Sequence, residues 1–413
     1  MTNYVPRNIL FIIPNLDFGG AQRSLCKVSK AFSKNHNVYV CIFNLDSGVA
    51  FSHGGKILDL GVSGSNNFFL KILNFFTRCM RLRSLKKFYS IDASISYLEG
   101  ANYVNLLSRY RDRIIISVRG SKVLDMNITG LIGMIRLKFL LPIIYRFADR
   151  IIALSHGIKS ELIEEFKLNA RRIDVIYNFY DLDETEVLKK LPIPKAFELV
   201  FEGKTLISAG RLSTEKGFDH LLNVYVQLKR LKPETKLVFL GDGPSRKLLV
   251  DYSKSLGLNT YSIFYDDFEE AISSDVFFLG YQQNPLQFFS RSTLFILASQ
   301  AEGGPNVLSE AMSCGLPVMS ADCPSGPRER LSYSSNHHHA ERITTAEFAD
   351  FGVLMPPFDK EADGQILQIW VETLDKILSN KQLLSNYSEK AQLRMKDFTK
   401  SNIFPLWERV VFR

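Results

Sequence analysis

Between residues 302 and 310 the chain reads Glu302-Gly303-Gly304-Pro305-Asn306-Val307-Leu308-Ser309-Glu310. The apolar run Leu294–Ala298 stands just before it and is long enough for a buried strand. Two glycines then let the backbone turn sharply, Pro305 suits a first helical turn, and Gly315 is the expected helix end. The stretch therefore predicts a strand, a tight turn and a helix, which is the repeating unit of a parallel α/β sheet.

The same stretch places carboxylates on both sides of the expected helix start. Free backbone N–H groups at a helix start can bind an anion, while Glu302 and Glu310 can accept hydrogen bonds from hydroxyl groups. A ligand with an anion in its middle and hydroxyls at both ends would fit, and a nucleotide sugar has that shape. The alternative is a glycine loop flanked by two solvated glutamates.

Apolar runs of the same kind recur along the chain and alternate with helical stretches. In the first half the candidate strands are Asn8–Ile13, Val38–Phe43, Ile91–Ser96, Ile114–Val118, Ile151–Leu154 and Asp174–Ile176. In the second half they are Leu206–Ala209, Lys236–Leu240, Val276–Leu279, Leu294–Ala298 and Pro317–Ser320. Strands that alternate with helices predict parallel sheets covered by helices on both faces.

The length of 413 residues exceeds one ordinary core, so two domains are expected. We predict an α/β protein with two Rossmann-like, doubly wound domains that face each other across a cleft, with ligands outside the carboxyl ends of the strands. The expected parts are residues 1–185, residues 186–385, and a helical segment 386–413 that returns to the first domain. Asp181–Lys204, with two prolines, has the composition of a linker.

Charge is distributed unevenly along the chain. Residues 1–180 hold 25 Lys and Arg against 12 Asp and Glu, whereas the remainder holds 26 against 31. A basic half is typical of a protein that meets an anionic surface. Residues 68–87 and 131–147 mix apolar and basic side chains, so they are candidates for interfacial helices on anionic lipid. Core-packed helices with a solvated basic face are the alternative.

The sequence gives little reason to expect a metal, a disulfide or a membrane span. Its five cysteines show no zinc-ligand spacing, which suits reduced thiols in a cytosol. No run approaches the ~20 apolar residues of a spanning helix. The D-x-D at Asp181–Asp183 falls in the expected linker, and adjacent histidines such as His337–His339 are usually solvent-exposed. We therefore expect no metal and no cofactor.

Cationic residues follow the candidate strand Leu206–Ala209. Arg211 and Lys216 bracket a turn there, and an arginine fork with a lysine point charge suits a diphosphate. Two exposed basic residues are the alternative. Glycine-rich turns stand at other strand ends, at Gly19-Gly20 and Gly241-Asp242-Gly243, and Asn284-Pro285 follows a further strand.

These pieces occur in one order over nearly the whole chain, and together they resemble the retaining GT-B glycosyltransferases of the family-4 type. The matching segments are Gly19–Arg23, Gly210–Leu212, Glu215–Phe218, Gly241–Gly243, Asn284-Pro285, Glu302–Met312, Gly315–Val318 and Gly326–Glu329. The resemblance is greatest to hexosyltransferase-type enzymes (EC 2.4) that assemble bacterial O-antigen or capsule polysaccharides. It implies a UDP-sugar donor, a lipid-linked saccharide acceptor and transfer that retains the anomeric configuration.

The resemblance also implies roles for individual residues. Arg211 and Lys216 would bind the donor diphosphate, Glu302 the donor sugar, and Glu310 the ribose, so Glu302, Arg211 and Lys216 are the expected catalytic residues. The expected donor-binding set is Gly20, Arg211, Lys216, Asn284, Glu302, Gly303, Gly304, Asn306, Val307, Leu308 and Glu310. The basic N-terminal domain would meet the acceptor and the anionic membrane surface, at the inner face of the cytoplasmic membrane.

One position departs from the family pattern. Relatives often carry a histidine after the strand that corresponds to Ile114–Val118, whereas this chain has Arg119 there. Arg119 would either hold an anionic acceptor or be a surface arginine, and His156 is a second candidate on the acceptor side. Two other functions stay open: a nucleotide-sugar epimerase, and a non-enzymatic basic binding protein. A nucleic-acid partner is not expected, because the phenylalanines follow helix faces instead of one sheet.

Overall fold

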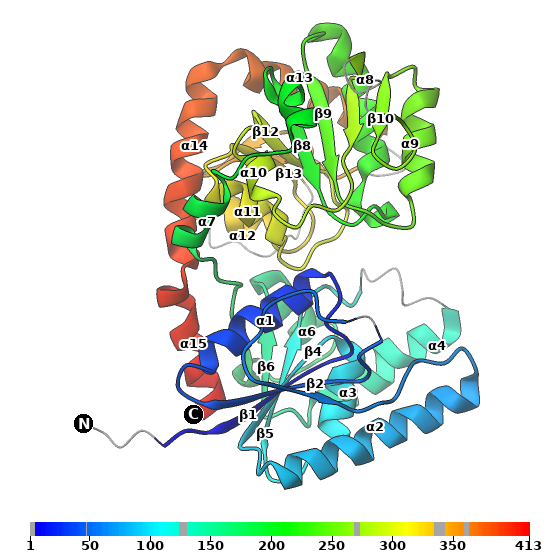
Figure 1. Ribbon diagram of the computed structural model, residues 1–413, viewed down its shortest axis with the longest axis vertical. Helices are drawn as coiled ribbons and strands as arrows, with labels where there is room; N and C mark the ends of the chain where they lie inside the picture. The colour runs from blue at the N-terminus through cyan, green and yellow to red at the C-terminus, as the bar shows by residue number, and fades with distance from the viewer. Residues whose placement is uncertain (1–4, 47, 124–129, 268–272, 334–342, 359–362) are drawn as a thin grey trace. The chain divides into compact units, whose positions relative to one another are not determined.

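The computed structural model describes residues 5–46, 48–123, 130–267, 273–333, 343–358 and 363–413 (Figure 1). The chain forms two compact units: unit 1 comprises residues 1–178 and 401–413, and unit 2 comprises residues 179–400. The chain therefore crosses between the units twice. The expected boundary at 185/186 falls inside α7 of unit 2, and only the last part of segment 386–413 belongs to unit 1.

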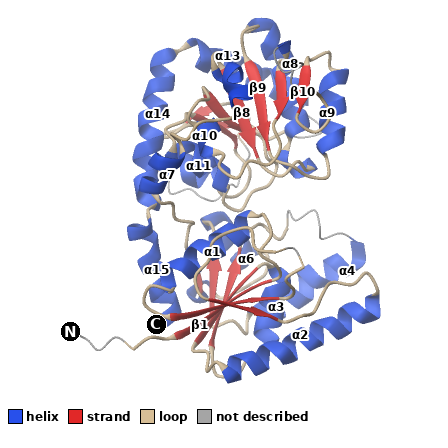
Figure 2. Ribbon diagram, in the orientation of Figure 1, coloured by secondary structure: helices blue, strands red, loops and turns tan. Residues whose placement is uncertain are grey.

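Unit 1 is a seven-stranded sheet in the order β3-β2-β1-β4-β5-β6-β7, and every pairing in it is parallel. Its strands are β1 (Asn8–Ile13), β2 (Asn37–Ile42), β3 (Lys56–Asp59), β4 (Ala93–Tyr97), β5 (Arg113–Val118), β6 (Arg150–Ala153) and β7 (Ile173–Val175). Its helices are α1 (Gly20–Phe32), α2 (Phe68–Phe88), α3 (Glu99–Leu107), α4 (Gly130–Ile135), the π-helix η1 (Arg136–Leu140), α5 (Leu141–Tyr145), α6 (His156–Glu164), the short 3₁₀ turn η2 (Ala170–Arg172) and α15 (Lys400–Phe412). Figure 2 shows helices on both faces of this sheet.

Unit 2 is an eight-stranded sheet in the order β10-β11-β9-β8-β12-β13-β15-β14. Its strands are β8 (Thr205–Ala209), β9 (Lys236–Leu240), β10 (Thr260–Ser262), β11 (Val276–Phe278), β12 (Leu294–Leu297), β13 (Val318–Ala321), β14 (Glu347–Phe348) and β15 (Val353–Met355). Its helices are α7 (Leu182–Leu188), α8 (Phe218–Leu231), α9 (Arg246–Ser255), α10 (Leu286–Phe289), α11 (Asn306–Ser313), α12 (Pro327–Leu331), α13 (Asp363–Ser379) and α14 (Lys381–Met395). The described residues of unit 2 also include the 3₁₀ turns η3 (Lys195–Phe201), η4 (Thr214–Lys216) and η6 (Lys396–Phe398).

The strands form where they do because both faces of each sheet are covered. In β1 the five residues from Ile9 to Ile13 are fully buried, and such strands read as continuous apolar runs. In both sheets the strand order reverses in the middle, between β1 and β4 and between β8 and β12, and in unit 2 the edge strands β10 and β14 also depart from sequence order. Ligands of doubly wound sheets bind outside the carboxyl ends of the strands at this point of reversal. The predicted doubly wound α/β architecture is confirmed for each unit.

Three details differ from the sequence-based expectation. The stretch Asp181–Lys204 is not an extended linker, because it contains α7 and η3 and belongs to unit 2. Strand β10 was not predicted, and it pairs in parallel with β11 at the sheet edge. Strands β3, β14 and β15 were also not predicted. His337–His339 lie outside the described residues.

Candidate active site

The site is built on two loops of unit 2 that leave neighbouring strands at the point of reversal. The loop after β8 carries Lys216, and the loop after β12 carries Glu302. Lys216 Nζ lies 2.6 Å from Glu302 Oε1, and the two side chains are 21% and 10% exposed. The structure therefore brings together two of the three predicted catalytic residues, which are 86 residues apart in sequence.

Backbone hydrogen bonds hold the neighbouring loops in a fixed arrangement. The N–H of Gly241 donates to the carbonyl of Gly280 at 2.7 Å, and the N–H of Gln300 donates to the carbonyl of Glu215 at 2.9 Å. Gly217 has φ +63, and a Cβ there would lie 2.3 Å from the carbonyl oxygen of Ala298. Only glycine fits this close, left-handed position, so the turn that positions Lys216 depends on it.

Lys216 is held in its charged form. Burial by itself would lower the pKa of Lys216, but the charge of Glu302, the hydrogen bond to Glu302 and the charge of Glu215 together raise this pKa above its ordinary value of 10.5. An ammonium group has three donors, and the contact with Glu302 uses one of them. The remaining donors can serve an anionic ligand.

The Glu302–Glu310 stretch has the predicted form of a turn followed by a helix. Pro305 precedes α11, whose buried face includes Leu308, Ala311 and Met312. Glu310 lies inside α11 and is 4% exposed. The first N–H groups of such a helix form an anion site, and this one starts four residues after Glu302. The local arrangement matches the expectation, while the ligand roles of Gly303, Gly304, Val307, Leu308 and Glu310 stay predictions.

Two further predicted donor residues differ in their surroundings. The side chain of Arg211 is exposed and makes no hydrogen bond or ion pair with the residues that the structure describes, whereas its backbone carbonyl accepts from Ser213 Oγ. Its five donors are thus directed to solvent. Asn284, in contrast, uses its side chain internally: Nδ2 donates to the carbonyl of Leu188 at 2.9 Å, and Oδ1 accepts from the N–H of Leu286. Its side chain joins α7 to the start of α10.

The candidates of unit 1 lie at carboxyl ends of its strands. Gly20 begins α1 after β1, and His156 begins α6 after β6 with its ring 6.3 Å from that of Tyr177. Arg119 is half-buried: its guanidinium donates to Ser24 Oγ at 2.8 Å and to Asn178 Oδ1, and it lies over the Tyr97 ring. Arg119 therefore links Ser24 of α1 to Asn178, the last residue of the first segment of unit 1. It is not a purely solvent-facing arginine.

Sequence reasoning missed several residues that shape these sites. Ser325 Oγ donates to the Glu302 carbonyl, and the hydroxyl of Tyr180 donates to Asn306 Oδ1 at 2.9 Å. Glu99, at the reversal point of unit 1, is buried and pairs with Arg136 at 2.7 Å. None of these has a local sequence signal, although Gly326, next to Ser325, was part of a matching segment.

The described part of the chain contains no group of three or more His, Cys, Asp or Glu side chains placed to hold a metal ion. The described helices also include none that is long and apolar enough to cross a membrane. The expectation that no cofactor is required stays a prediction.

The fold and the Lys216–Glu302 pair together define a class of protein. Two doubly wound parallel α/β units, with a cation, a carboxylate and a helix start at one reversal point, are the architecture of GT-B transferases. Family models match both units: one described as Glycosyltransferase Family 4 over residues 18–184, and one described as Glycosyl transferases group 1 over residues 192–341.

Individual relatives agree with these matches. An uncharacterized glycosyltransferase of Methanocaldococcus jannaschii is 28% identical over 277 residues, 65% of this chain and 64% of that protein. The N-acetylgalactosamine-N,N'-diacetylbacillosaminyl-diphospho-undecaprenol 4-alpha-N-acetylgalactosaminyltransferase of Campylobacter jejuni is 26% identical over 399 residues, 95% of each chain. The crystal structure of Anabaena HepE in complex with UDP superposes with a TM-score of 0.69 over 98% of this chain and 99% of that one, at 19% identity.

This chain belongs to the family-4-type glycosyltransferases of the GT-B fold. It is a hexosyltransferase-type enzyme, and several of its relatives are named for lipid-linked or lipopolysaccharide acceptors.

Proposed function

We propose that this enzyme transfers a sugar from a UDP-sugar to a lipid-linked oligosaccharide, with retention of the anomeric configuration, at the inner face of the cytoplasmic membrane. The observation that carries the proposal is the Lys216–Glu302 pair at the β8/β12 reversal point, beside the start of α11. Relatives support the substrate classes. The HepE structure contains UDP, and the Campylobacter enzyme is named for an undecaprenol diphosphate acceptor.

In this proposal the donor diphosphate occupies the start of α11. Lys216 and Arg211 stabilise the charge that develops on the diphosphate as the glycosidic bond breaks. Glu302 holds the donor sugar, while Glu310 holds the ribose. The protein would act chiefly by positioning and electrostatics, and the departing diphosphate would itself help to take the proton of the acceptor.

The proposed membrane contact rests on α2 of unit 1. Five apolar side chains lie at helical spacing along one side of α2 and are all exposed: Phe69, Ile72, Leu73, Phe76 and Met80. The helix carries six basic residues and no acidic one. An exposed apolar stripe with cations nearby is typical of helices that lie on anionic lipid.

The proposal is tested by offering a panel of labelled UDP-sugars together with a bacterial membrane extract. The expected result is that one donor is consumed and its label appears in a lipid-linked product with the anomeric configuration of the donor. Inversion of that configuration would contradict the retaining mechanism. Conversion of a donor without any acceptor would instead favour an epimerase.

A further inference from the structure

A basic hollow lies in unit 1 at the amino ends of the strands, whereas the predicted acceptor residues lie at the carboxyl ends. It has a volume of about 290 Å³ and is lined by Tyr145, Arg146, Ile151, Lys167, Leu168, Asn169 and Arg172. These residues come from the end of α5, the start of β6 and the connection from α6 to β7, so they lie at the amino ends of the strands. His156 and Arg119 follow the carboxyl ends of β6 and β5. The hollow is therefore separate from the predicted acceptor site.

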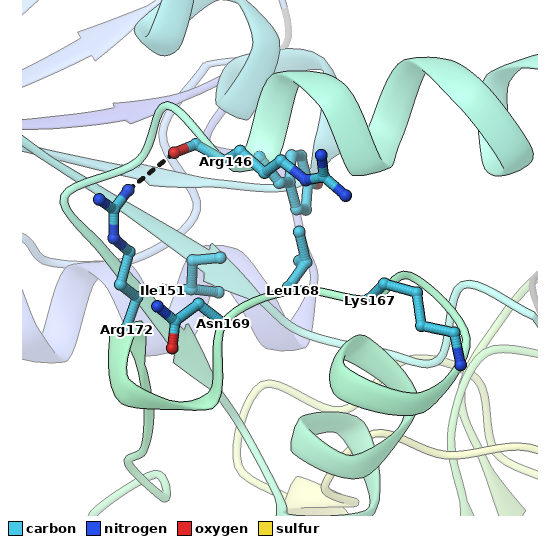
Figure 3. Close-up of a pocket in the computed structure, with 7 residues that line it drawn as sticks. Arg146, Ile151, Lys167, Leu168, Asn169 and Arg172 are labelled. Carbon is cyan, nitrogen blue, oxygen red and sulfur yellow. Dashed lines mark hydrogen bonds between the residues drawn. The ribbon is translucent and has the colours of Figure 1, made fainter.

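Three cations surround the hollow and leave an apolar floor between them. Figure 3 shows Arg146, Lys167 and Arg172 at different corners around Ile151 and Leu168. None of the seven lining residues is acidic. Within the described chain, none of the three cations forms an ion pair with a carboxylate. Their charges are thus not neutralised by the protein, which favours an anionic occupant.

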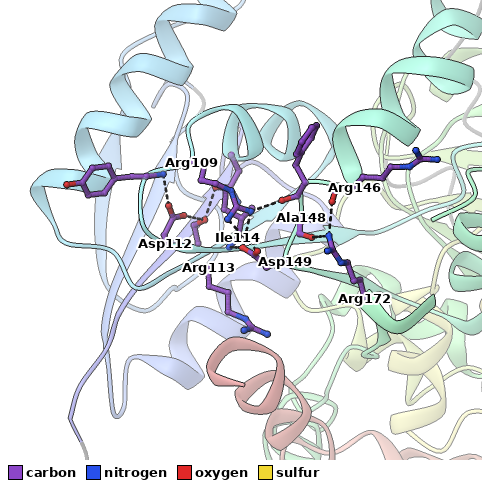
Figure 4. Close-up of polar contacts among 12 residues, drawn as sticks. Arg109, Asp112, Arg113, Ile114, Arg146, Ala148, Asp149 and Arg172 are labelled. Atoms are coloured by element: carbon purple, nitrogen blue, oxygen red, sulfur yellow. Dashed lines mark hydrogen bonds and ion pairs between the residues drawn. The ribbon is translucent and has the colours of Figure 1, made fainter. Parts of the chain in front are cut away.

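The turn that carries Arg146 is fixed in place by other arginines. Arg172 Nη1 donates to the carbonyls of Arg146 and Ala148 at 2.8 and 3.4 Å, and Arg109 Nη2 donates to the carbonyl of Phe147 at 2.6 Å (Figure 4). Arg109 also pairs with Asp149 at 3.0 Å. Carbonyl groups at a helix end would repel an anion. Here the carbonyl groups of Arg146, Phe147 and Ala148 each accept a hydrogen bond from a guanidinium group, which offsets that repulsion.

An exposed apolar row leads to the same turn. Four side chains spaced four residues apart are between 51% and 62% exposed: Ile135, Phe139, Ile143 and Phe147. Ile135, Phe139 and Ile143 belong to the consecutive helical segments α4, η1 and α5, and Phe147 lies in the turn that follows α5. Phe147, at the end of the row, is adjacent in sequence to Arg146 of the hollow. Apolar side chains therefore stand next to a cationic hollow, which is the pattern of a surface that meets a phospholipid layer.

We propose that this hollow binds the phosphate-bearing headgroup of an anionic phospholipid while the row Ile135–Phe147 enters the acyl region beside it. The volume is at the small end of ligand pockets, ~300–1,000 Å³, so it suits a headgroup and not a whole lipid. This inference rests on the membrane contact in the proposed function, and it adds a second attachment point to α2. It assigns the hollow to the membrane and not to the acceptor.

The test compares charge-matched variants in vesicle binding. Arg146→Gln/Lys167→Gln removes two cations of the hollow, and Lys30→Gln/Lys34→Gln removes two exposed cations from α1 and the residues after it in the same unit. With phosphatidylcholine vesicles that contain phosphatidylglycerol, the first pair should lower affinity about 25-fold, since each basic residue at such a surface contributes about fivefold. The second pair should stay within about twofold.

Each outcome bears on the proposal. Equal losses in the two pairs, or no binding of the wild type to anionic vesicles, would overturn it. Binding of inorganic phosphate at Arg146 and Lys167 in solution, with vesicle affinity unchanged by the first pair, would assign the hollow to a free anion. Transfer to a water-soluble acceptor analogue should be equal in the wild type and in both pairs. Absence of transfer in the wild type would refute the proposed function without affecting the vesicle comparison.

Discussion

At the scale of single residues, the site of unit 2 combines the ion pair Lys216–Glu302 with an arginine, Arg211, whose charge has no carboxylate partner among the described residues. Lys216 is paired with Glu302, whereas the side chain of Arg211 is exposed and forms no ion pair with the described residues. Breaking a buried pair leaves a charge without compensation, which is costly. Glu302 thus keeps Lys216 in place before a ligand arrives, while Arg211 can close on a ligand from solvent.

Replacement of Lys216 by Ala should lower kcat/KM about 10²- to 10³-fold, because a positioned donor for developing negative charge contributes about that much. Arg211→Lys should also be impaired, since a lysine lacks the two-pronged donor geometry. The matched control is Arg230→Ala, which removes an exposed cation at the far end of α8. Turnover is measured with the identified donor, and an unchanged melting temperature confirms that the fold is intact. Activity of Lys216→Ala equal to that of the control would refute the assigned role.

The raised pKa of Lys216 makes a second prediction. Because this pKa lies above 10.5 in the folded enzyme, the folded state keeps the proton to higher pH than the unfolded chain does. The stabilisation from the pair is complete below 10.5 and is lost only as pH rises through the folded value. We expect no alkaline loss of kcat/KM from Lys216 up to about pH 10. An alkaline limb near pH 9 that shifts in Lys216→Arg would contradict this.

At the scale of elements, α2 has to serve two surfaces. Its first half exposes the apolar stripe, whereas its second half is held to the sheet by Lys86. Lys86 Nζ lies 2.9 Å from Asp112 Oδ2, and both side chains are fully buried. Lys86 also donates to Asn105 Oδ1 at 2.7 Å, and Ser94 Oγ donates to Asp112. Burial lowers the pKa of Lys86 to about 8, against the opposing charge of Asp112. The pair therefore fixes the orientation of α2.

Lys86→Met should lower the free energy of unfolding by about 3–5 kcal/mol, since it leaves Asp112 buried and charged without a partner. Adding Asp112→Asn should restore part of the loss, because the uncompensated charge is then gone. Lys87→Met is the matched control, as Lys87 is exposed on the same helix. Chemical denaturation measures the wild type, the single variants Lys86→Met and Asp112→Asn, the double variant and the control. A double variant as unstable as the sum of two independent losses would show that the pair is not the coupling element.

Strands that are buried on both faces could be predicted from the sequence, whereas several short or polar strands could not. β1 and β9 were predicted with their observed ends, because strands buried on both faces give unbroken apolar runs. β10 reads Thr260-Tyr261-Ser262 and therefore gives no apolar run, so it was missed, and β15 was missed as well. Lys216 and Glu302 were recognisable because each follows a strand. Ser325 and Tyr180 were not, because only the folded chain brings them to the site.

At the scale of the whole molecule, unit 1 is discontinuous in sequence. Its last element, α15, packs against strands and helices formed by the first hundred residues. Trp407 is 1% exposed and stacks on Tyr97 at 6.2 Å, and Phe404 contacts Phe32 at 4.8 Å. Arg113 donates to the Val410 carbonyl at 3.1 Å. Unit 1 is therefore complete only when the end of the chain has been made, whereas unit 2 is formed by one continuous segment.

Trp407→Ala should thus destabilise one unit and not the other. Loss of a buried tryptophan costs about 3–5 kcal/mol, and we expect faster amide hydrogen exchange in β1 and β4 of unit 1. Arg409→Ala, an exposed change on the same helix, is the matched control. UDP affinity should stay within about twofold of wild type, because the predicted donor residues Arg211, Lys216, Glu302 and Glu310 all belong to unit 2. Equal acceleration of exchange in both units would mean that they unfold as one. An accompanying loss of UDP affinity would mean that unit 1, where Gly20 is the predicted donor residue, contributes a large part of donor binding.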